Sequence, residues 1–130
     1  MGFRHLFLSL SLFSTMFCAV DSAFARTLVP YEEAKVQEAM TEEKAIVVEV
    51  YADWCPSCKK GHVALEKALD ETPNIAAFQI DFDKDEELLK KYGVEEQGTV
   101  LIVKEGKEVA RLAGEHRVDA IVEWIKSKGV

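Results

Sequence analysis

From residue 27 onward, apolar positions follow two rhythms that alternate along the chain. Short runs rich in β-branched residues predict strands, whereas apolar residues three and four positions apart predict helices. The expected strands cover residues 27–29, 46–51, 75–82, 99–104 and 108–113. The expected helices cover residues 31–43, 55–70, 85–92 and 117–128. In the first and last helices, the positions expected to face inward are Ala34, Val36, Ala39, Met40, Val118, Ile121, Val122 and Ile125.

The order of these elements, β-α-β-α-β-α-β-β-α, is typical of an α/β fold. Strands that alternate with helices pair in parallel, and the crossover helices cover both faces of the sheet. Glu105-Gly106-Lys107 is a short Gly-containing loop between the last two strands and predicts an antiparallel hairpin at one edge. The sequence therefore predicts one domain, residues 26–130, with a central mixed sheet between two layers of helices.

The first 25 residues have the three parts of a secretory signal peptide. Arg4 supplies the charged start, residues 6–20 are almost unbroken apolar sequence, and Ala23-Phe24-Ala25 is an A-x-A cleavage site. We expect cleavage after Ala25 and export to the periplasm or another extracytoplasmic space. The alternative is an uncleaved membrane anchor, although the apolar run is short against the roughly 20 residues of a membrane span. Cys18 is interpreted as an apolar residue of this segment, because no small residue precedes it as lipid attachment would require.

The formal net charge of −7 limits the partners of the domain. Removing residues 1–25 takes away one positive and one negative charge, so the net charge stays the same. An acidic domain is a poor ligand for nucleic acid or for an anionic membrane surface. Its length of about 105 residues is enough to bury a core without disulfide staples. Cys55 and Cys58 are therefore free for chemistry, and we expect a monomer that needs neither a cofactor nor a metal.

The segment Cys55-Pro56-Ser57-Cys58 carries the clearest chemical signal. It follows a strand-like run and opens a helix, where unpaired backbone N–H groups and the helix dipole stabilise a thiolate. Proline suits the first turn of a helix, because its fixed φ angle is already helical. The second thiol, one turn later, can attack a mixed disulfide formed by the first. This spacing predicts a dithiol–disulfide redox centre.

At these residues the chain resembles the thioredoxin family over nearly the whole mature sequence. The resemblance rests on residues 48–59, 80–83, 91–94 and 101–108. It implies a thioredoxin fold, an exposed attacking thiol at Cys55, a buried resolving thiol at Cys58, and protein thiols and disulfides as partners. The family's substrate contacts correspond to Trp54, Pro56, Gln97, Gly98, Thr99 and Gly114.

Gly98 departs from the family pattern, which has a cis-proline opposite the active site. A cis bond before a residue other than proline costs about 3 kcal/mol, so we expect a trans bond or a differently shaped loop here. Glycine permits unusual backbone geometry. The position is either a tolerated loop variant or a change in how substrate docks.

Glu49 stands where many family members have a buried aspartate. A carboxylate behind Cys58 would accept its proton when that thiol becomes the nucleophile, and burial would raise the pKa of the carboxyl group. The alternative is a glutamate that points outward at an edge of the sheet.

His62 shares a helical face with Cys58, four residues earlier. The family often has a small residue at this position and a lysine where Gln79 stands. We therefore hypothesise that His62 lies near Glu49 and Cys58 and modulates them in place of that lysine. The alternative is a histidine that reaches toward the helix surface. Cys55, Cys58 and His62 also form a C-x2-C-x3-H set, but a structural zinc site would need a fourth ligand that the sequence does not supply.

These patterns predict an exported thiol–disulfide oxidoreductase that reduces rather than oxidises protein disulfides in the cell envelope. The C-P-x-C centre is similar to those of cytochrome-maturation reductases. The run from Tyr51 to Cys55 looks like the periplasmic domain of a membrane-embedded reductant conduit, which implies a membrane-bound electron donor. Two alternatives remain at this level, namely a partner-binding module and a module that delivers copper or another metal through its thiols.

Overall fold

A computed structural model of the chain describes residues 28–43 and 45–130. The signal peptide or anchor, its cleavage site, Cys18 and the start of the domain at residue 26 lie outside these residues. None of the helices in the described part of the chain is both long and apolar enough to cross a membrane.

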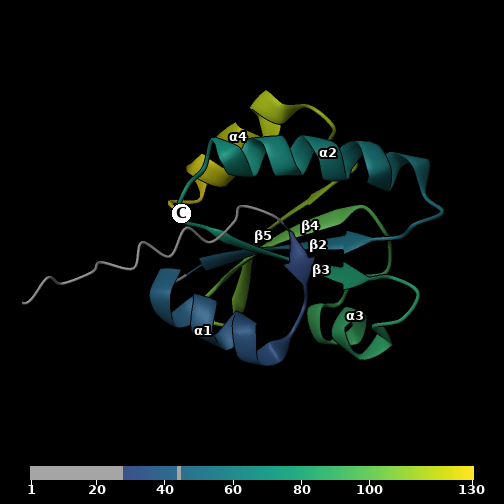
Figure 1. Cartoon of the computed structure of the whole chain (residues 1–130), viewed down its shortest axis with the longest axis horizontal. Helices are drawn as coiled ribbons and strands as arrows, with labels where there is room; N and C mark the ends of the chain where they lie inside the picture. The colour runs from purple at the N-terminus through teal and green to yellow at the C-terminus, as the bar shows by residue number, and fades with distance from the viewer. Residues whose placement is uncertain (1–27, 44) are drawn as a thin grey trace, which may run out of the picture.

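A five-stranded mixed sheet forms the centre of the domain (Figure 1). Its order is β1-β3-β2-β4-β5, in which β2 pairs in parallel with β3 and antiparallel with β4. The strands are β1 (Val29–Pro30), β2 (Ala45–Tyr51), β3 (Ala76–Asp81), β4 (Thr99–Lys104) and β5 (Lys107–Ala113). The helices are α1 (Glu33–Glu43), α2 (Pro56–Asp70), α3 (Glu86–Tyr92) and α4 (Val118–Ser127).

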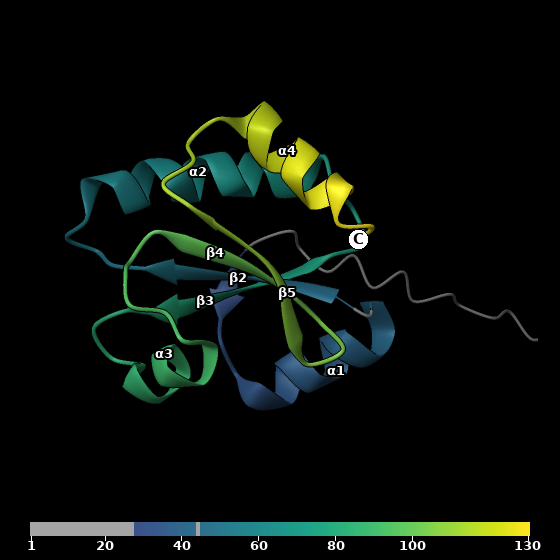
Figure 2. The ribbon, with the colours of Figure 1, turned by 180° about the vertical axis from the view of Figure 1, so that it is seen from behind.

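Helices cover both faces of this sheet. Figures 1 and 2 show α2 and α4 on one face and α1 and α3 on the other. The antiparallel pair β4–β5 forms one edge, with a register irregularity between Ile102 and Val103. The α/β fold predicted from the sequence, a thioredoxin fold with a central mixed sheet, is therefore confirmed.

The first strand and helix start later than the sequence predicts. The backbone N–H of Tyr31 donates to the carbonyl of Gln79 at 2.8 Å, which continues the β1–β3 ladder and keeps Tyr31 out of the helix. The prediction that Ala34 faces inward is wrong, because Ala34 is exposed. The buried face of α1 follows Val36, Ala39 and Met40 at i, i+3 and i+4, and Ala34 falls on the other side.

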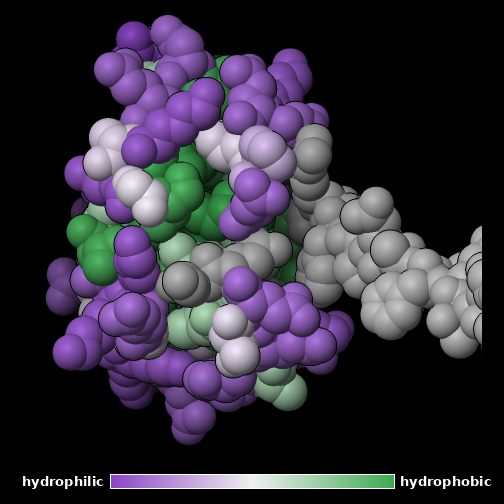
Figure 3. All heavy atoms as spheres, turned by 90° about the vertical axis from the view of Figure 1, so that its left-hand side faces the viewer, coloured by the Kyte–Doolittle hydropathy of each residue, from purple (hydrophilic) through white to green (hydrophobic). Residues whose placement is uncertain are grey.

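Two apolar cores lie on either side of β2, whose side chains alternate between them. Val48 and Val50 pack with the α1 side, whereas Val47 packs with α2 and α4. Glu49 points to the same side as Val47, and it is the only charged residue buried within the described ranges. Figure 3 shows the end of the domain at the left of Figure 1, where apolar side chains lie in a band between hydrophilic layers. A charged group in the middle of this strand requires an explanation.

Candidate active site

Cys55 lies at the junction of β2 and α2 as the N-cap of the helix. Pro56 occupies the first turn, and the backbone N–H of Cys58 donates to Cys55 Sγ at 3.3 Å. The hydroxyl oxygen of Ser57 lies 3.1 Å from the same sulfur. The sulfur therefore accepts hydrogen bonds at a helix N-terminus, where negative charge is stabilised.

The two thiols have very different acidities. The Cys58 thiol and the Ser57 hydroxyl, as hydrogen-bond partners, lower the pKa of Cys55 to about 7, and Gln97 contributes in the same direction. Burial and the neighbouring Cys55 raise the pKa of Cys58 to about 11. Cys55 is thus the thiol that is substantially ionised at neutral pH, and only the thiolate is a good nucleophile.

One expectation about these thiols is wrong. Cys55 is only 3% exposed, nearly as buried as Cys58 at 2%. Ala52 and the two cysteines form a small cluster against which Tyr51 and Phe82 pack, so the attacking thiol is covered by its neighbours. The neighbouring Pro56 and Ser57 are exposed, which places the sulfur directly beneath the surface.

Glu49 is buried on the sheet beneath α2, as the resemblance implied, and does not point outward at an edge. The side chain is held by two groups on its Oε2 atom: Gln79 Nε2 donates at 2.9 Å, and His62 Nδ1 lies at 2.8 Å. Gln79 reaches Glu49 because the two residues face each other on the parallel strands β2 and β3. Burial raises the pKa of Glu49 even though both hydrogen bonds act to lower it.

His62 lies against Glu49, as the sequence hypothesis expected. Its ring also lies 5.3 Å from that of Tyr51, and its Nε2 atom is 3.5 Å from Glu66 Oε1. The side chain is 26% exposed, so it connects the buried carboxylate with the surface of α2. The structure thus places Glu49, His62 and Gln79 in one polar cluster between the sheet and α2, and His62 is turned toward Glu49 rather than away from the domain.

The loop at Gly98 differs in shape from a cis-proline loop. The structure has no cis peptide bond among residues 28–43 and 45–130, and Gly98 has a φ of +78°. Its N–H donates to the Val50 carbonyl at 2.8 Å, and the N–H of Gly114 donates to its carbonyl at 3.4 Å. A Cβ at Gly98 would lie 3.6 Å from Cys58 Sγ, so the backbone passes close to the resolving thiol.

The other residues of the expected substrate site lie around this loop. Thr99 is buried, and its hydroxyl donates to the Glu96 carbonyl at 2.8 Å. Trp54 is 59% exposed and donates from Nε1 to Asp83 Oδ2 at 2.9 Å, which holds the indole on the β3–α3 side of the thiols.

Asp83 and Ser57 were missed as site residues. The position of Ser57 inside the motif was a usable signal, whereas the contact of Asp83 with Trp54 was not encoded locally.

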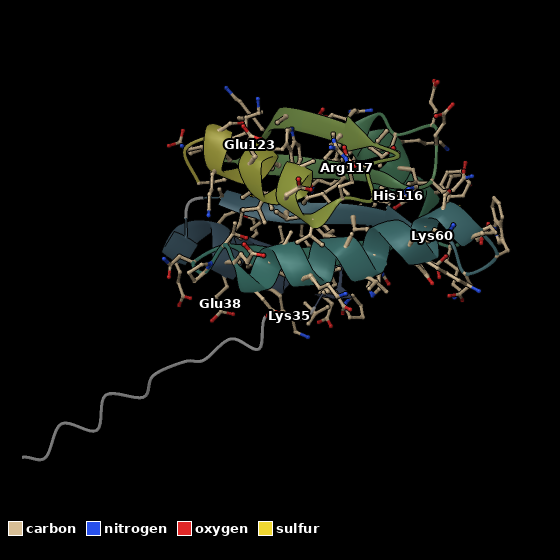
Figure 4. All side chains as sticks on the ribbon, turned by 90° about the horizontal axis from the view of Figure 1, so that it is seen from above. Lys35, Glu38, Lys60, His116, Arg117 and Glu123 are labelled. Atoms are coloured by element: carbon tan, nitrogen blue, oxygen red, sulfur yellow. The ribbon has the colours of Figure 1, made fainter. Side chains whose placement is uncertain are left out.

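A small pocket of about 50 Å³ lies behind Cys58. It is bounded by α2, the Gly98 loop and the segment after β5, and its lining includes Glu49, Cys58, Gln97, Gly98, Gly114 and His116. Figure 4 labels His116 near the start of α4, on the side that faces α2. The pocket gives Glu49 and Cys58 a common space, although no direct hydrogen bond joins them among the described residues.

The C-x2-C-x3-H set does not come together as a ligand set. His62 directs Nδ1 to Glu49, and the described part of the chain contains no group of three His, Cys, Asp or Glu side chains arranged to hold a metal ion.

The fold and the site define a class of protein: an α/β domain that exchanges thiols for disulfides through a Cys-x-x-Cys pair at a helix N-terminus. The thioredoxin family model matches residues 27–127, and the chain belongs to the thioredoxin family.

The relatives agree with this assignment. Thioredoxin-1 of Saccharomyces cerevisiae is 32% identical over 81 residues, which cover 62% of this chain and 79% of the yeast protein. A putative protein disulfide-isomerase of Schizosaccharomyces pombe is 27% identical over 95 residues, which cover 72% of this chain but only 19% of that longer protein. The crystal structure of Trxlp from Edwardsiella tarda has a TM-score of 0.69 and 29% identity, covering 75% of this chain and 97% of that one. The chain is thus a thioredoxin-like thiol–disulfide oxidoreductase that uses Cys55 and Cys58.

Proposed function

We propose that this protein is an exported reductant of protein disulfides in the cell envelope. The observation that carries the proposal is the acidity of the two thiols, with a pKa of about 7 at Cys55 and about 11 at Cys58. The exported location is supported by the signal-peptide pattern of residues 1–25.

The reaction has two steps. The Cys55 thiolate attacks one sulfur of a substrate disulfide, which forms a mixed disulfide and releases the first substrate thiolate. Cys58 then loses its proton and attacks Cys55 Sγ, which forms the Cys55–Cys58 disulfide and releases the second substrate thiolate. Both leaving thiolates take a proton from solvent, and two electrons move from the dithiol to the substrate.

Glu49 is the proton acceptor for the second step. The high pKa of Cys58 means that this thiol needs a base, and Glu49 shares the pocket behind it. Burial raises the pKa of Glu49, which brings the carboxylate closer to the acidity at which it accepts protons efficiently.

The modest acidity of Cys55 supports the reducing direction. At pH 7, a thiol with a pKa of about 7 is about half ionised, so its ionisation stabilises the reduced form by less than about 1 kcal/mol relative to a fully protonated thiol. A pKa of about 3.5, as in strong oxidants of this kind, would stabilise the reduced form by about 5 kcal/mol. Ionisation of Cys55 therefore stabilises the reduced dithiol only slightly, so the dithiol donates its electrons readily.

Two measurements test the direction. The purified domain is equilibrated with glutathione buffers to obtain its reduction potential, and reduction of a protein disulfide is followed with a chemical donor present. We expect a potential more negative than about −200 mV and catalytic turnover of the protein disulfide. A potential near −120 mV, or a chain that only oxidises dithiols, would refute the reducing role.

Location and substrates are tested with the full chain in a bacterial host. Cys58→Ala leaves Cys55 to hold substrates as mixed disulfides, and Cys55→Ala is the matched control that cannot attack. We expect a product that starts near residue 26 in the periplasmic fraction, with envelope proteins held only by the Cys58→Ala chain. A full-length membrane-bound product would favour the anchor, and equal capture by both variants would argue against the exchange reaction.

Such a reductant must be reduced again after each turnover. A membrane-bound electron donor is the corresponding proposal, because an exported protein is separated from the cytoplasmic donors. Deleting a membrane donor should leave the Cys55–Cys58 pair oxidised in cells, which thiol alkylation before electrophoresis would reveal.

A further inference from the structure

The unusual feature of this site is the histidine between the buried carboxylate and the helix surface. His62 Nδ1 lies 2.8 Å from Glu49 Oε2, and His62 Nε2 lies 3.5 Å from Glu66 Oε1. The side chain of Glu49 is 4% exposed, that of His62 26% and that of Glu66 39%, so exposure rises along the series. The three residues form a series of contacts that leads from the interior toward solvent.

We propose that His62 is a positioning and proton-relay residue that carries the Cys58 proton from Glu49 to solvent by way of Glu66. The inference rests on the proposed reaction and deepens it, because it supplies the exit that a buried base requires. A carboxyl group that accepts a proton in each turnover has to lose it before the next.

Every group that faces His62 is consistent with this role. On β2 these are Glu49 and the ring of Tyr51, and on β3 the amide of Gln79, whose Nε2 is 3.4 Å from Nδ1. Within α2, Glu66 lies four residues later. A neutral imidazole carries its proton on either nitrogen, so Nδ1 can accept a proton from a protonated Glu49 while Nε2–H faces the Glu66 carboxylate.

The two oxygens of the Glu49 carboxylate can take different parts in the transfer, one toward Cys58 and the other toward His62. Within residues 28–43 and 45–130, the hydrogen bonds of the Glu49 side chain all involve Oε2, with Gln79 and His62. The Oε1 atom therefore remains available to accept a proton, and Glu49 lines the pocket that it shares with Cys58. A half turn of the carboxyl group then brings the proton to the His62 side.

The proton balance is complete. Cys58 gives its proton to Glu49, and the resulting thiolate forms the disulfide with Cys55. The Glu49 carboxyl proton passes to Nδ1 while Nε2–H passes its proton to the Glu66 carboxylate, which exchanges with solvent. Rotation of the imidazole ring then brings Nδ1–H to the exposed side, where it gives its proton to solvent and Nε2 takes one up, and rotation back resets the histidine. No group other than the dithiol and the substrate disulfide changes oxidation state.

The test separates the two chemical steps in one experiment. The reduced protein is mixed with an aromatic disulfide that releases a coloured thiolate, one equivalent when Cys55 attacks and a second when Cys58 resolves the mixed disulfide. Both rates are measured between pH 5.5 and 9, in water and in deuterium oxide. His62→Gln retains an amide that can hold Glu49 but cannot relay a proton, and Glu66→Gln removes the outer carboxylate. Glu71→Gln, an exposed position after α2, is the control with the same change of charge.

In His62→Gln we expect the second step to slow about tenfold or more, with a changed pH profile and the first step unaltered. Glu66→Gln should slow the second step less and respond to added buffer, and Glu71→Gln should behave as wild type. His62→Ala leaves room beside Glu49, and free imidazole should restore much of its second-step rate, which a merely structural histidine would not allow.

Three results would overturn the relay. These are an unchanged second step in His62→Gln, equal slowing of both steps, or a slow His62→Ala second step that imidazole leaves as it is. The proposed function fails in a different way, because in that case the wild-type chain itself would not release the second equivalent.

Discussion

Restoring the family's proline at position 98 should damage this protein. Proline fixes φ near −65° and lacks an N–H. Gly98 has a φ of +78°, and its N–H donates to the Val50 carbonyl at 2.8 Å. Gly98→Pro therefore has to rebuild the loop and leaves the Val50 carbonyl without this partner.

The size of the effect follows from these two losses. An incompatible proline costs about 3 kcal/mol or more, against a total stability of about 5–15 kcal/mol for a domain. For a domain of this size, each 1 kcal/mol lowers the Tm by about 4–8 °C, so the Tm should fall by about 12–24 °C. Urea and thermal unfolding of the reduced protein measure both quantities.

Alanine substitutions separate the backbone effect from the effect on the thiol. Gly98→Ala keeps the N–H and carries only the penalty of a positive φ, about 1–2 kcal/mol. Gly106 has a nearly identical φ of +77° but no heavy atom within 4 Å of an added Cβ, so Gly106→Ala is the matched control. Both should lose similar stability, whereas only Gly98→Ala, whose Cβ would lie 3.6 Å from Cys58 Sγ, should change the reactivity of Cys58. A Gly98→Pro protein as stable as wild type would refute the reasoning about this loop.

Three further predictions concern the thiols, the buried carboxylate and α2. Alkylation of Cys55 should be half-maximal at about pH 7, and Ser57→Ala should move that midpoint upward, because it removes a hydrogen bond that lowers the pKa of Cys55; an unmoved midpoint would contradict the role of Ser57. Burial raises the pKa of Glu49 in the folded protein, so ionisation of this group opposes folding once the pH exceeds its pKa in the unfolded chain. Urea unfolding should therefore show that Glu49→Gln gains more stability relative to wild type at pH 8 than at pH 4. An equal difference in the free energy of unfolding at the two pH values would contradict this. Gly61→Ala should stabilise α2 by about 0.5–1 kcal/mol, because the added Cβ lies at an ordinary 3.5 Å from His116 Cδ2; a lower Tm would show that this contact is too tight.

Much of the fold could be predicted because its signals are local. The spacing of apolar residues predicted the order of strands and helices, and the position of the C-x-x-C motif between a strand and a helix predicted a dithiol at a helix N-terminus. The neighbourhood of Glu49 and His62 was also predictable, since a buried strand position lies beneath the helical face that carries Cys58. Their contact at 2.8 Å agrees with that hypothesis.

The remaining features depend on contacts between distant segments. The late start of α1 arises from a hydrogen bond between Tyr31 and Gln79, and the shape of the Gly98 loop from one with Val50. Trp54 donates to Asp83, which follows the neighbouring strand β3 and lies 29 positions along the chain. Local propensity carries no information about such partners, and the burial of Cys55 likewise depends on Phe82, which packs against it from another strand end.

The positions that depart from the family pattern all lie near Cys58, the thiol that acts in the second step of the reaction. The neighbours of Cys55, namely the N-cap position, the Cys58 N–H and the Ser57 hydroxyl, are provided by the motif itself. The altered positions instead surround Cys58: Gly98 passes beside its sulfur, and the Glu49–His62–Gln79 cluster lies behind the pocket that it lines. The acidity of the attacking thiol therefore needs nothing that is special to this chain. Release of the substrate depends on Cys58. The residues around Cys58 therefore influence how long a mixed disulfide persists. Substitutions there should alter the rate of the second step and leave the rate of the first step unchanged.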